Sequence, residues 1–327
     1  MGHRNRRGRF VDPVIPIGDG SQVTQGRSLV NDRAICPNAA FPDVSAQEHV
    51  PQGENVRALR ASLNTLGDGF VEALPSGLLA QIAVEQCRRS RGAVCGELVL
   101  VPVLEAEGRL RVGRFGWKAQ HASLLSFSAD AYLNEMGITS ELQPEEVTEL
   151  CDTVEDPENE AEEDGLADID RFARFMRATK APARDEALAA SRDALVGSAV
   201  FDAIGCATCH VRTLVTAPAG SVVNAGAFEV PEALGNKIIH PFSDFLLHDV
   251  GTGDGIVQNG GQRTAAKLRT PPLWGVRLRG RLMHDAASLT FEEAILRHRR
   301  EASGVVRGYG RLSREEQRQL GVFLSSL

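Results

Sequence analysis

The stretch that decides the fold is Cys206-Ala207-Thr208-Cys209-His210, a single C-x-x-C-H motif in a chain of 327 residues. This spacing lets two thiols reach the two vinyl groups of one porphyrin and puts the adjacent histidine beneath the iron. A zinc half-site or a redox dithiol is compatible with the same five letters. The motif therefore predicts haem c held by Cys206 and Cys209, with His210 as an iron ligand.

The sequence on both sides of the motif favours haem over the alternatives. A predicted helix over about 187–204 carries Gly197 and Phe201 and leads directly into the motif. A closing helix over 313–327 begins with the capping box of Ser313 and Glu316 and carries apolar residues at its end. Class I cytochromes c cross their first and last helices in this way, and we expect the same crossing here.

The second axial position of the iron has three downstream candidates. Met283 and His284 lie in RLMHDAASL, and His298 lies in EEAILRHRREA. A methionine ligand raises the potential of a haem, whereas a second histidine lowers it. His284 could instead be a hydrogen-bonding residue near the haem edge, and His298 a polar residue on an exposed helix face.

Composition and charge exclude several classes of protein. The formal net charge is −7, the isoelectric point is near 5.7, and the basic clusters are isolated, so we expect no nucleic-acid partner. No apolar run approaches the roughly 20 residues that cross a bilayer. The first 20 residues, MGHRNRRGRFVDPVIPIGDG, have no continuous apolar segment, so no signal peptide is visible.

Four cysteines lie outside the motif, and three disulfide connectivities are possible for them. Cys87 and Cys95 flank a turn-like segment, so we favour that pair, which leaves Cys36 with Cys151. Four buried free thiols are the alternative.

The rest of the chain divides around an acidic segment. Residues 1–54 are rich in Pro, Gly, Asn and Asp and are predicted to be irregular, whereas 151–165 is dense in carboxylates and is predicted to be a solvated linker. Alternating valines and a Glu107-Gly108 turn predict a hairpin over 97–111. Further helices are predicted at 55–66, 79–87, 122–136, 167–179 and 291–300, with mostly loop over 211–290.

Several longer motifs, in order, carry a resemblance to a known family. They are LGDGFVEAL at 66–74, GRFGWKAQHASLLSFSADAYLNEMGIT at 113–139, DIDRFARFMR at 168–177, HPFSDFLLHDVG at 240–251 and KLRTPPLWGVRLRGRLMHDAASLTFEEAILRH at 267–298. Together they resemble the di-haem oxidoreductases, also called thiol oxidoreductase-like proteins, which are related to the di-haem cytochrome c peroxidases. The likeness covers about residues 55–327.

The resemblance implies roles for particular residues. His298 occupies the position of the distal ligand in the related peroxidases, so it implies bis-histidine iron and leaves Met283 in the core. Trp117 matches a tryptophan that relays electrons between two haems, although a packed aromatic side chain is compatible with the same position. Glu135 falls near an acid that faces the N-terminal haem, where it would be a general acid or base; an exposed helix glutamate is the alternative.

Four more residues fall in the matched segments. Arg269 and Trp274 belong to RTPPLW and are expected to hold the haem propionates, unless this segment is a structural turn built on its two prolines. His240 and His248 have no ligand spacing, and we expect both to be structural.

This chain departs from the family in having one C-x-x-C-H motif where members carry two. Together with the missing export signal, the departure predicts a fragment or a start placed after the first haem. The expected fold is mainly α, with a partial, mixed N-terminal cytochrome c-like domain at 1–150, which contains the hairpin, and a C-terminal cytochrome c domain at 166–327. The acidic segment lacks a calcium-loop spacing, so no calcium is expected.

The expected function of the chain as written is electron transfer through one covalent haem. A peroxidase-like di-haem oxidoreductase is the alternative if an upstream motif exists, and a non-functional remnant is the third possibility. We expect a periplasmic or cell-envelope location, because haem c is attached outside the bacterial cytoplasmic membrane. The expected partner is a redox protein or a quinol-linked chain.

Overall fold

The structure is a computed structural model that describes residues 36–40, 42–43, 56–144 and 160–327, and the backbone of strands β1 (Phe10–Val11), β2 (Ile15–Pro16) and β3 (Gln22–Val23). Its helices are α1 (Asp68–Glu72), α2 (Ser76–Arg89), α3 (Leu124–Ala131), α4 (Asp168–Ala178), α5 (Glu186–Ala189), α6 (Arg192–Ala203), α7 (Phe291–Arg297), α8 (Ser303–Tyr309) and α9 (Arg314–Ser325). A π-helical turn, η1 (Tyr132–Met136), continues α3.

All sheets of the described residues have two antiparallel strands. The pairs are β1 with β4 (Arg57–Ala58), β2 with β3, β5 (Leu100–Pro102) with β6 (Leu110–Val112), β7 (Leu214–Val215) with β10 (Ile238–Ile239), β8 (Val222–Val223) with β9 (Phe228–Glu229), and β11 (Leu247–His248) with β12 (Leu268–Arg269). The fold is thus mixed, with more helix than strand, which is a coarser class than the mainly α fold expected. The hairpin predicted over 97–111 is confirmed as β5–β6.

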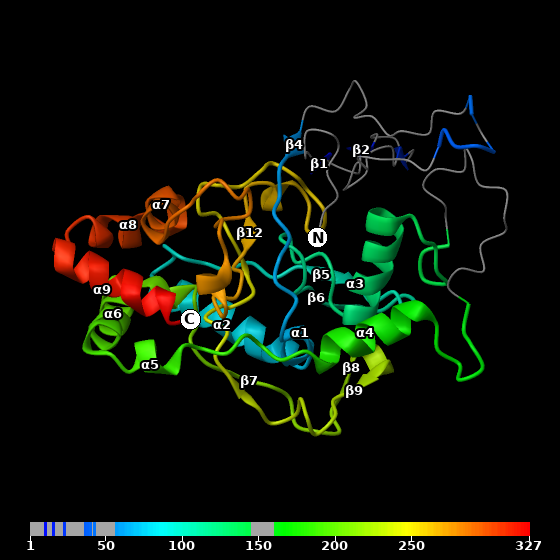
Figure 1. Ribbon diagram of the computed structural model, residues 1–327, viewed down its shortest axis with the longest axis horizontal. Helices are drawn as coiled ribbons and strands as arrows, with labels where there is room; N and C mark the ends of the chain where they lie inside the picture. Colours follow the sequence, from blue (N-terminus) through cyan, green and yellow to red (C-terminus); the bar gives the residue numbers. More distant parts are fainter. Residues whose placement is uncertain are drawn as a thin grey trace.

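The crossing of α6 and α9 is confirmed, and it organises one end of the molecule (Figure 1). A Cβ atom at Gly197 would lie 1.9 Å from the backbone oxygen of Gln319, so only glycine allows this approach. The rings of Phe201 and Phe323 pack edge to face, 5.4 Å between centroids, inside an apolar core. The predicted capping box is present, because the Glu316 amide donates to Ser313 Oγ while the Ser313 amide donates to the Glu316 carboxylate.

Two details of this end differ from the prediction. The helix expected over 187–204 is broken into α5 and α6, because Ser191 caps a new helix by accepting from the Ala194 amide. Helix α8 was not predicted at all, since Gly304 and Gly308 weaken its local propensity. Its position follows from packing, with Tyr309 buried in the same core.

A second core lies at the other end of the molecule, where α1, α2, α3 and α4 meet (Figure 1). Buried Val71, Leu79, Phe127 and Met176 come from these four helices in turn. The predicted helices over 79–87, 122–136 and 167–179 are all present. The division of the chain into domains stays a prediction; residues 151–159 of the acidic segment lie outside the described residues, and 160–165 are exposed.

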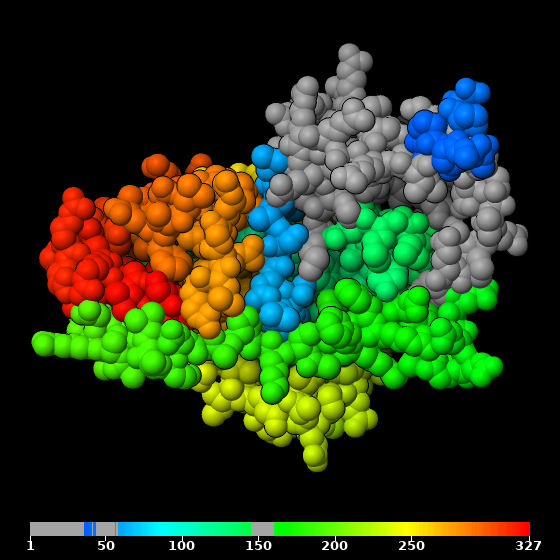
Figure 2. Space-filling view, in the orientation of Figure 1, coloured from blue at the N-terminus to red at the C-terminus, as the bar shows by residue number. Residues whose placement is uncertain are grey.

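The helix predicted over 55–66 is wrong: its described residues, 56–66, form strand β4 and then a loop. Its backbone groups bond to distant loops: the Ala61 amide donates to the His284 oxygen at 2.6 Å, and the Ser62 oxygen accepts from Arg279 at 2.8 Å. Leu59 and Leu66, two of the residues that suggested a helical face, are each 43% exposed. In Figure 2 the segment is a blue strip beside the orange loop that precedes α7.

The cysteine prediction is confirmed for one pair. Cys87 and Cys95 form a disulfide, and the motif cysteines Cys206 and Cys209 are free. Cys36 is also disulfide-bonded, and its expected partner, Cys151, lies outside the described residues. Within the described ranges, no helix has the length and apolar character needed to span a bilayer.

Candidate functional site

The C-x-x-C-H motif follows directly from the end of α6. Gly205, with φ of 98°, turns the chain out of the helix, and Cys206–Thr208 form the short helix η2. Gln86 of α2 donates to the Thr208 oxygen at 2.6 Å and so fixes the motif against the other half of the chain. Both thiols therefore have a defined position, although the motif contains only one short helical turn.

A cavity of about 470 Å³ lies beside the motif, within the range of roughly 300–1,000 Å³ typical of ligand sites. Its walls come from α6 and α9, from α7 and α8, and from the loops around β11 and β12. It is lined by nearly all of the residues expected to act together: Cys206, Cys209, His210, His298, Arg269, Trp274 and Trp117. Residues more than 90 positions apart in the sequence thus meet in one space.

Two histidines in this wall have the same arrangement. His210 Nδ1 lies 2.9 Å from the Phe242 oxygen, and His298 Nδ1 lies 2.8 Å from the Ala294 oxygen. A carbonyl accepts a hydrogen bond, so Nδ1 carries the proton and Nε2 keeps its lone pair. Burial lowers the pKa of His210 to about 4 and also lowers the pKa of His298. Both rings are therefore neutral at pH 7, in the tautomer that binds a metal through Nε2.

The two motif thiols are protonated at neutral pH. Burial raises the pKa of Cys206 to about 12 and also raises the pKa of Cys209. A reactive dithiol or a zinc site requires thiolates, which a lowered pKa would favour. Cys209, Asp244 and His248 bring their ligand atoms within 4.8 Å of one another, but both ring nitrogens of His248 already face carboxylates.

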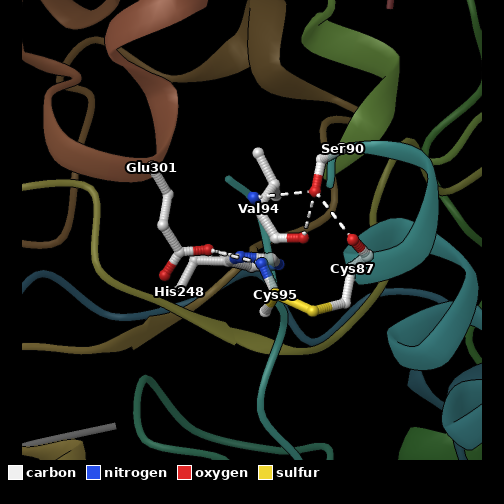
Figure 3. Close-up of a disulfide and its surroundings, with 6 residues drawn as sticks. All are labelled: Cys87, Ser90, Val94, Cys95, His248 and Glu301. Atoms are coloured by element: carbon white, nitrogen blue, oxygen red, sulfur yellow. Dashed lines mark hydrogen bonds and ion pairs between the residues drawn. A yellow bond between two sulfur atoms is a disulfide. The ribbon is translucent and has the colours of Figure 1, made fainter. Parts of the chain in front are cut away.

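His248 is the residue that the sequence analysis undervalued. Its Nε2 lies 2.8 Å from Asp244 Oδ2, and its Nδ1 is 3.8 Å from Cys209 Sγ. The same Nδ1 lies 2.9 Å from Glu301 Oε2 (Figure 3). The Asp-x-x-x-His spacing in SDFLLHD was a signal for this pair, but Glu301 had none. His240, in contrast, is exposed and contacts Thr213, as a structural residue would.

Buried polar atoms in the cavity wall lack partners among the described residues. They are Trp274 Nε1, Thr252 Oγ1 and His284 Nδ1. The Trp117 indole, in contrast, donates to the Ala61 oxygen at 2.7 Å, and its ring packs edge to face with His284 at 6.0 Å. A buried donor without an acceptor costs about 1–3 kcal/mol, so these atoms indicate a missing polar ligand.

Arg269 adds a buried positive charge to the same wall. Its Nε donates to the Gly116 oxygen at 2.7 Å, and its guanidinium lies over the Phe245 ring at 5.6 Å. Burial lowers the pKa of Arg269 to about 10, so the side chain remains charged at pH 7. A carboxylate in the cavity would be attracted to it.

Glu135 was expected to face an N-terminal haem, and its role stays a prediction, because the cavity beside the motif does not test it. It lies in η1 outside the wall of this cavity, and burial raises its pKa. Met283 was expected in the core, but its backbone has φ of 68° and its half-buried side chain lines the cavity. The tight turn over 282–288, in which the Leu282 and Ser288 backbones bond to each other, brings Met283 and His284 to this wall together.

The comparisons with known proteins concern most of the chain. The family model described as "Di-haem oxidoreductase, putative peroxidase" matches residues 44–327. The comparison with curated proteins gave no match. A solved structure of hydrazine synthase from Kuenenia stuttgartiensis, pressurized with xenon, is 18% identical over 49% of this chain and 55% of that chain, with a TM-score of 0.30. This chain thus spans about half of that protein, and a likeness at this level carries no functional argument.

Proposed function

The chain belongs to the di-haem oxidoreductase family, and on that premise we propose that it is a c-type cytochrome that transfers electrons. In this proposal Cys206 and Cys209 would hold one haem by thioether bonds, and His210 and His298 would be the ligands of its iron. A haem bound in this way supplies one-electron chemistry at its iron, with a potential set by the axial ligands. The protein supplies the ligands, the pocket and the surrounding charges.

The observation that carries the proposal is the matched pair of histidines. His210 and His298 come from different elements, face one cavity, and both have Nδ1 held by a backbone carbonyl. Such a bond fixes the ring orientation and the tautomer of a metal ligand. A structural histidine needs neither a partner of the same kind nor a cavity beside it.

The remaining wall fits a group that has an apolar body and carboxylates at its edge. Phe201, Leu273 and Leu324 supply apolar surface to the cavity. Trp274 Nε1 is a donor without an acceptor among the described residues, and Arg269 is a charged donor in the same wall. Haem propionates would satisfy both. Trp117, fixed by its bond to Ala61, lies where an aromatic ring can assist electron passage at the cavity edge.

The location and partner are part of the proposal. Disulfides persist in oxidising compartments, and the Cys87–Cys95 bond supports a periplasmic or cell-envelope location. An electron-transfer protein must exchange electrons with a second redox centre, so we infer a redox protein or a quinol-linked chain as partner.

Peroxidase activity is the second candidate, and the description of the family favours it. It requires an iron with one open position and a nearby acid or base. His298 would have to leave the iron, or a second haem would have to supply the reactive centre. Glu135, the expected acid, does not line the described cavity.

The test is to express the chain with an export signal and the haem c maturation machinery and to record its pyridine haemochrome and its absorption spectrum. We expect one covalent haem with a low-spin bis-histidine spectrum. His298→Met should change that spectrum, whereas His240→Met, on the exposed surface, should not. Absence of covalent haem would refute the proposal, and a high-spin spectrum with peroxide turnover would favour the peroxidase.

A further inference from the structure

A continuous series of contacts connects the Cys87–Cys95 disulfide with the haem motif. Figure 3 shows its first part, from the disulfide to Glu301 and His248. The Cys95 amide donates to Glu301 Oε2 at 3.1 Å. The same carboxylate oxygen lies 2.9 Å from His248 Nδ1, and that nitrogen is 3.8 Å from Cys209 Sγ. Four residues from four separate parts of the sequence therefore lie in one series of contacts.

His248 is the charged member of this series, and its position is fixed from all sides. Its side chain is 2% exposed, and the Asp244 carboxylate on its other nitrogen is fully buried. Gln86 donates to Asp244 Oδ2 at 2.5 Å, and the Leu246 amide donates to Asp244 Oδ1 at 2.9 Å. Burial alone would lower the pKa of His248, but the two carboxylates raise it well above its ordinary value. Because ionised carboxylates only accept hydrogen bonds, both ring nitrogens of His248 carry protons, and the ring is a cation.

The disulfide also shapes the neighbouring cavity wall. It closes the loop over 88–94, in which Ser90 Oγ accepts from the Val94 amide at 2.9 Å and donates to the Val94 oxygen at 2.9 Å. Ala93 and Val94 line the cavity. The disulfide therefore fixes the position of this loop relative to the Cys95 amide.

We propose that His248 is a positioning residue that holds a positive charge against the Cys209 sulfur, and that the Cys87–Cys95 disulfide keeps this charge in place through Glu301. The effect of this charge on the potential of a bound haem rests on the proposed function. Its effect on the reactivity of the Cys209 thiol does not, because that effect is present in the haem-free chain.

Two measurable properties follow from a cation at this position. In the haem-free chain it stabilises the Cys209 thiolate, which is the form that reacts with iodoacetamide. In the haem-loaded chain it disfavours the oxidised iron, which carries one more positive charge than the reduced iron. Removal of the charge should therefore slow alkylation of Cys209 and lower the midpoint potential.

The experiment measures iodoacetamide alkylation of Cys209 in the full-length, haem-free chain by mass spectrometry, with Cys206 as the internal reference. His248→Gln should reduce the Cys209 to Cys206 rate ratio about tenfold, as expected when a thiol pKa rises by about one. His240→Gln is the matched control and should leave it unchanged. In any variant that unfolds, Cys209 and Cys206 would instead be alkylated at similar rates.

The role of the disulfide is tested by the double variant Cys87→Ser/Cys95→Ser. A chemical reductant is unsuitable, because Cys36 is also disulfide-bonded. The double variant should reduce the rate ratio in the same direction as His248→Gln, but by less. Combined with His248→Gln it should have no further effect, because the two changes act through one network. Additive effects would overturn the coupling.

The haem-loaded chain provides the second measurement. His248→Gln should lower the midpoint potential by about 59 mV, which corresponds to a tenfold change for one electron. An unchanged potential together with an unchanged alkylation ratio would overturn the proposal. If no covalent haem forms while the alkylation ratios change as expected, the proposed function fails and the assignment of His248 stands.

Discussion

Two buried polar regions of the molecule differ in how completely their hydrogen bonds are satisfied. Around fully buried Glu72, the carboxylate accepts from Arg177 at 2.6 and 3.0 Å, from Asn224 at 2.9 Å and from the Leu124 amide at 2.8 Å. Arg111 beside it donates to the oxygens of Glu72 and Leu74. All buried nitrogen and oxygen atoms of these side chains have partners.

The cavity beside the C-x-x-C-H motif is the opposite case. Trp274 Nε1, Thr252 Oγ1 and His284 Nδ1 have no partner among the described residues, although all three atoms are buried. Buried polar atoms without hydrogen-bond partners destabilise the folded state unless a ligand satisfies them. The comparison indicates that the Glu72 network holds the fold together, whereas the cavity wall is built for a ligand.

Glu72→Leu would break the complete network and should have the largest effect. It leaves the Arg177 guanidinium, the Asn224 amide and the Leu124 amide without their acceptor. Removal of one partner of a buried ion pair costs about 3–5 kcal/mol of unfolding free energy, which urea unfolding of the haem-free chain would measure. Glu107→Leu, at the exposed hairpin turn, is the control and should change stability little. A loss below about 1 kcal/mol for Glu72→Leu would contradict a structural role.

Asp68 feels a charged residue from each of the two regions: Arg269 lowers its pKa, and Glu72 raises it. Burial raises the pKa of Asp68 to about 8, although Arg269 opposes the rise. The folded chain therefore retains a proton that the unfolded chain releases near pH 4. The stability that protonated Asp68 contributes is fully present below pH 4 and is lost as the pH rises toward 8, by about 1.4 kcal/mol of unfolding free energy per pH unit.

Asp68→Asn should remove this part of the pH dependence, because an amide keeps the shape of the side chain and does not titrate. The measurement is urea unfolding of the haem-free chain at several pH values between 4 and 8. Asp164→Asn, at a site that is 54% exposed, is the control. If the slope were the same in Asp68→Asn and in the wild type, Asp68 would not be the titrating group.

The crossing of α6 and α9 could be predicted because its signals are local. Gly197, the helix around it and the capping box at Ser313 all lie within short windows, and the structure uses each as expected. The segment at 56–66 could not be predicted in this way. Its apolar spacing suits a helix, but its amides and carbonyls bond to residues more than 200 positions away. Tertiary contacts override local pattern there.

The candidate site shows the same division. The motif and His298 were found because their residues are short sequence signals or lie in a matched segment. Glu301 was missed because a lone carboxylate has no signal until the fold brings it to His248, whereas the Asp244–His248 spacing was a signal that went unused. The unpartnered Trp274 nitrogen is likewise a property of packing, which no sequence pattern reports.

The two tryptophans of the chain provide the finest test of the comparison, because one indole is satisfied and the other is not. Trp274→Phe removes an unpartnered buried donor, so in the haem-free chain it should change stability by no more than about 1 kcal/mol. Trp117→Phe leaves the Ala61 oxygen without its donor and should cost about 1–2 kcal/mol more. With haem bound, the difference in stability loss between the two variants should be smaller, because Trp274→Phe then removes the donor of a hydrogen bond to the haem. Thermal unfolding of both variants, with and without haem, measures this difference. A Trp274→Phe variant that loses as much stability as Trp117→Phe without haem would show that the Trp274 indole already has a partner, and that the cavity wall is a structural network like the one around Glu72.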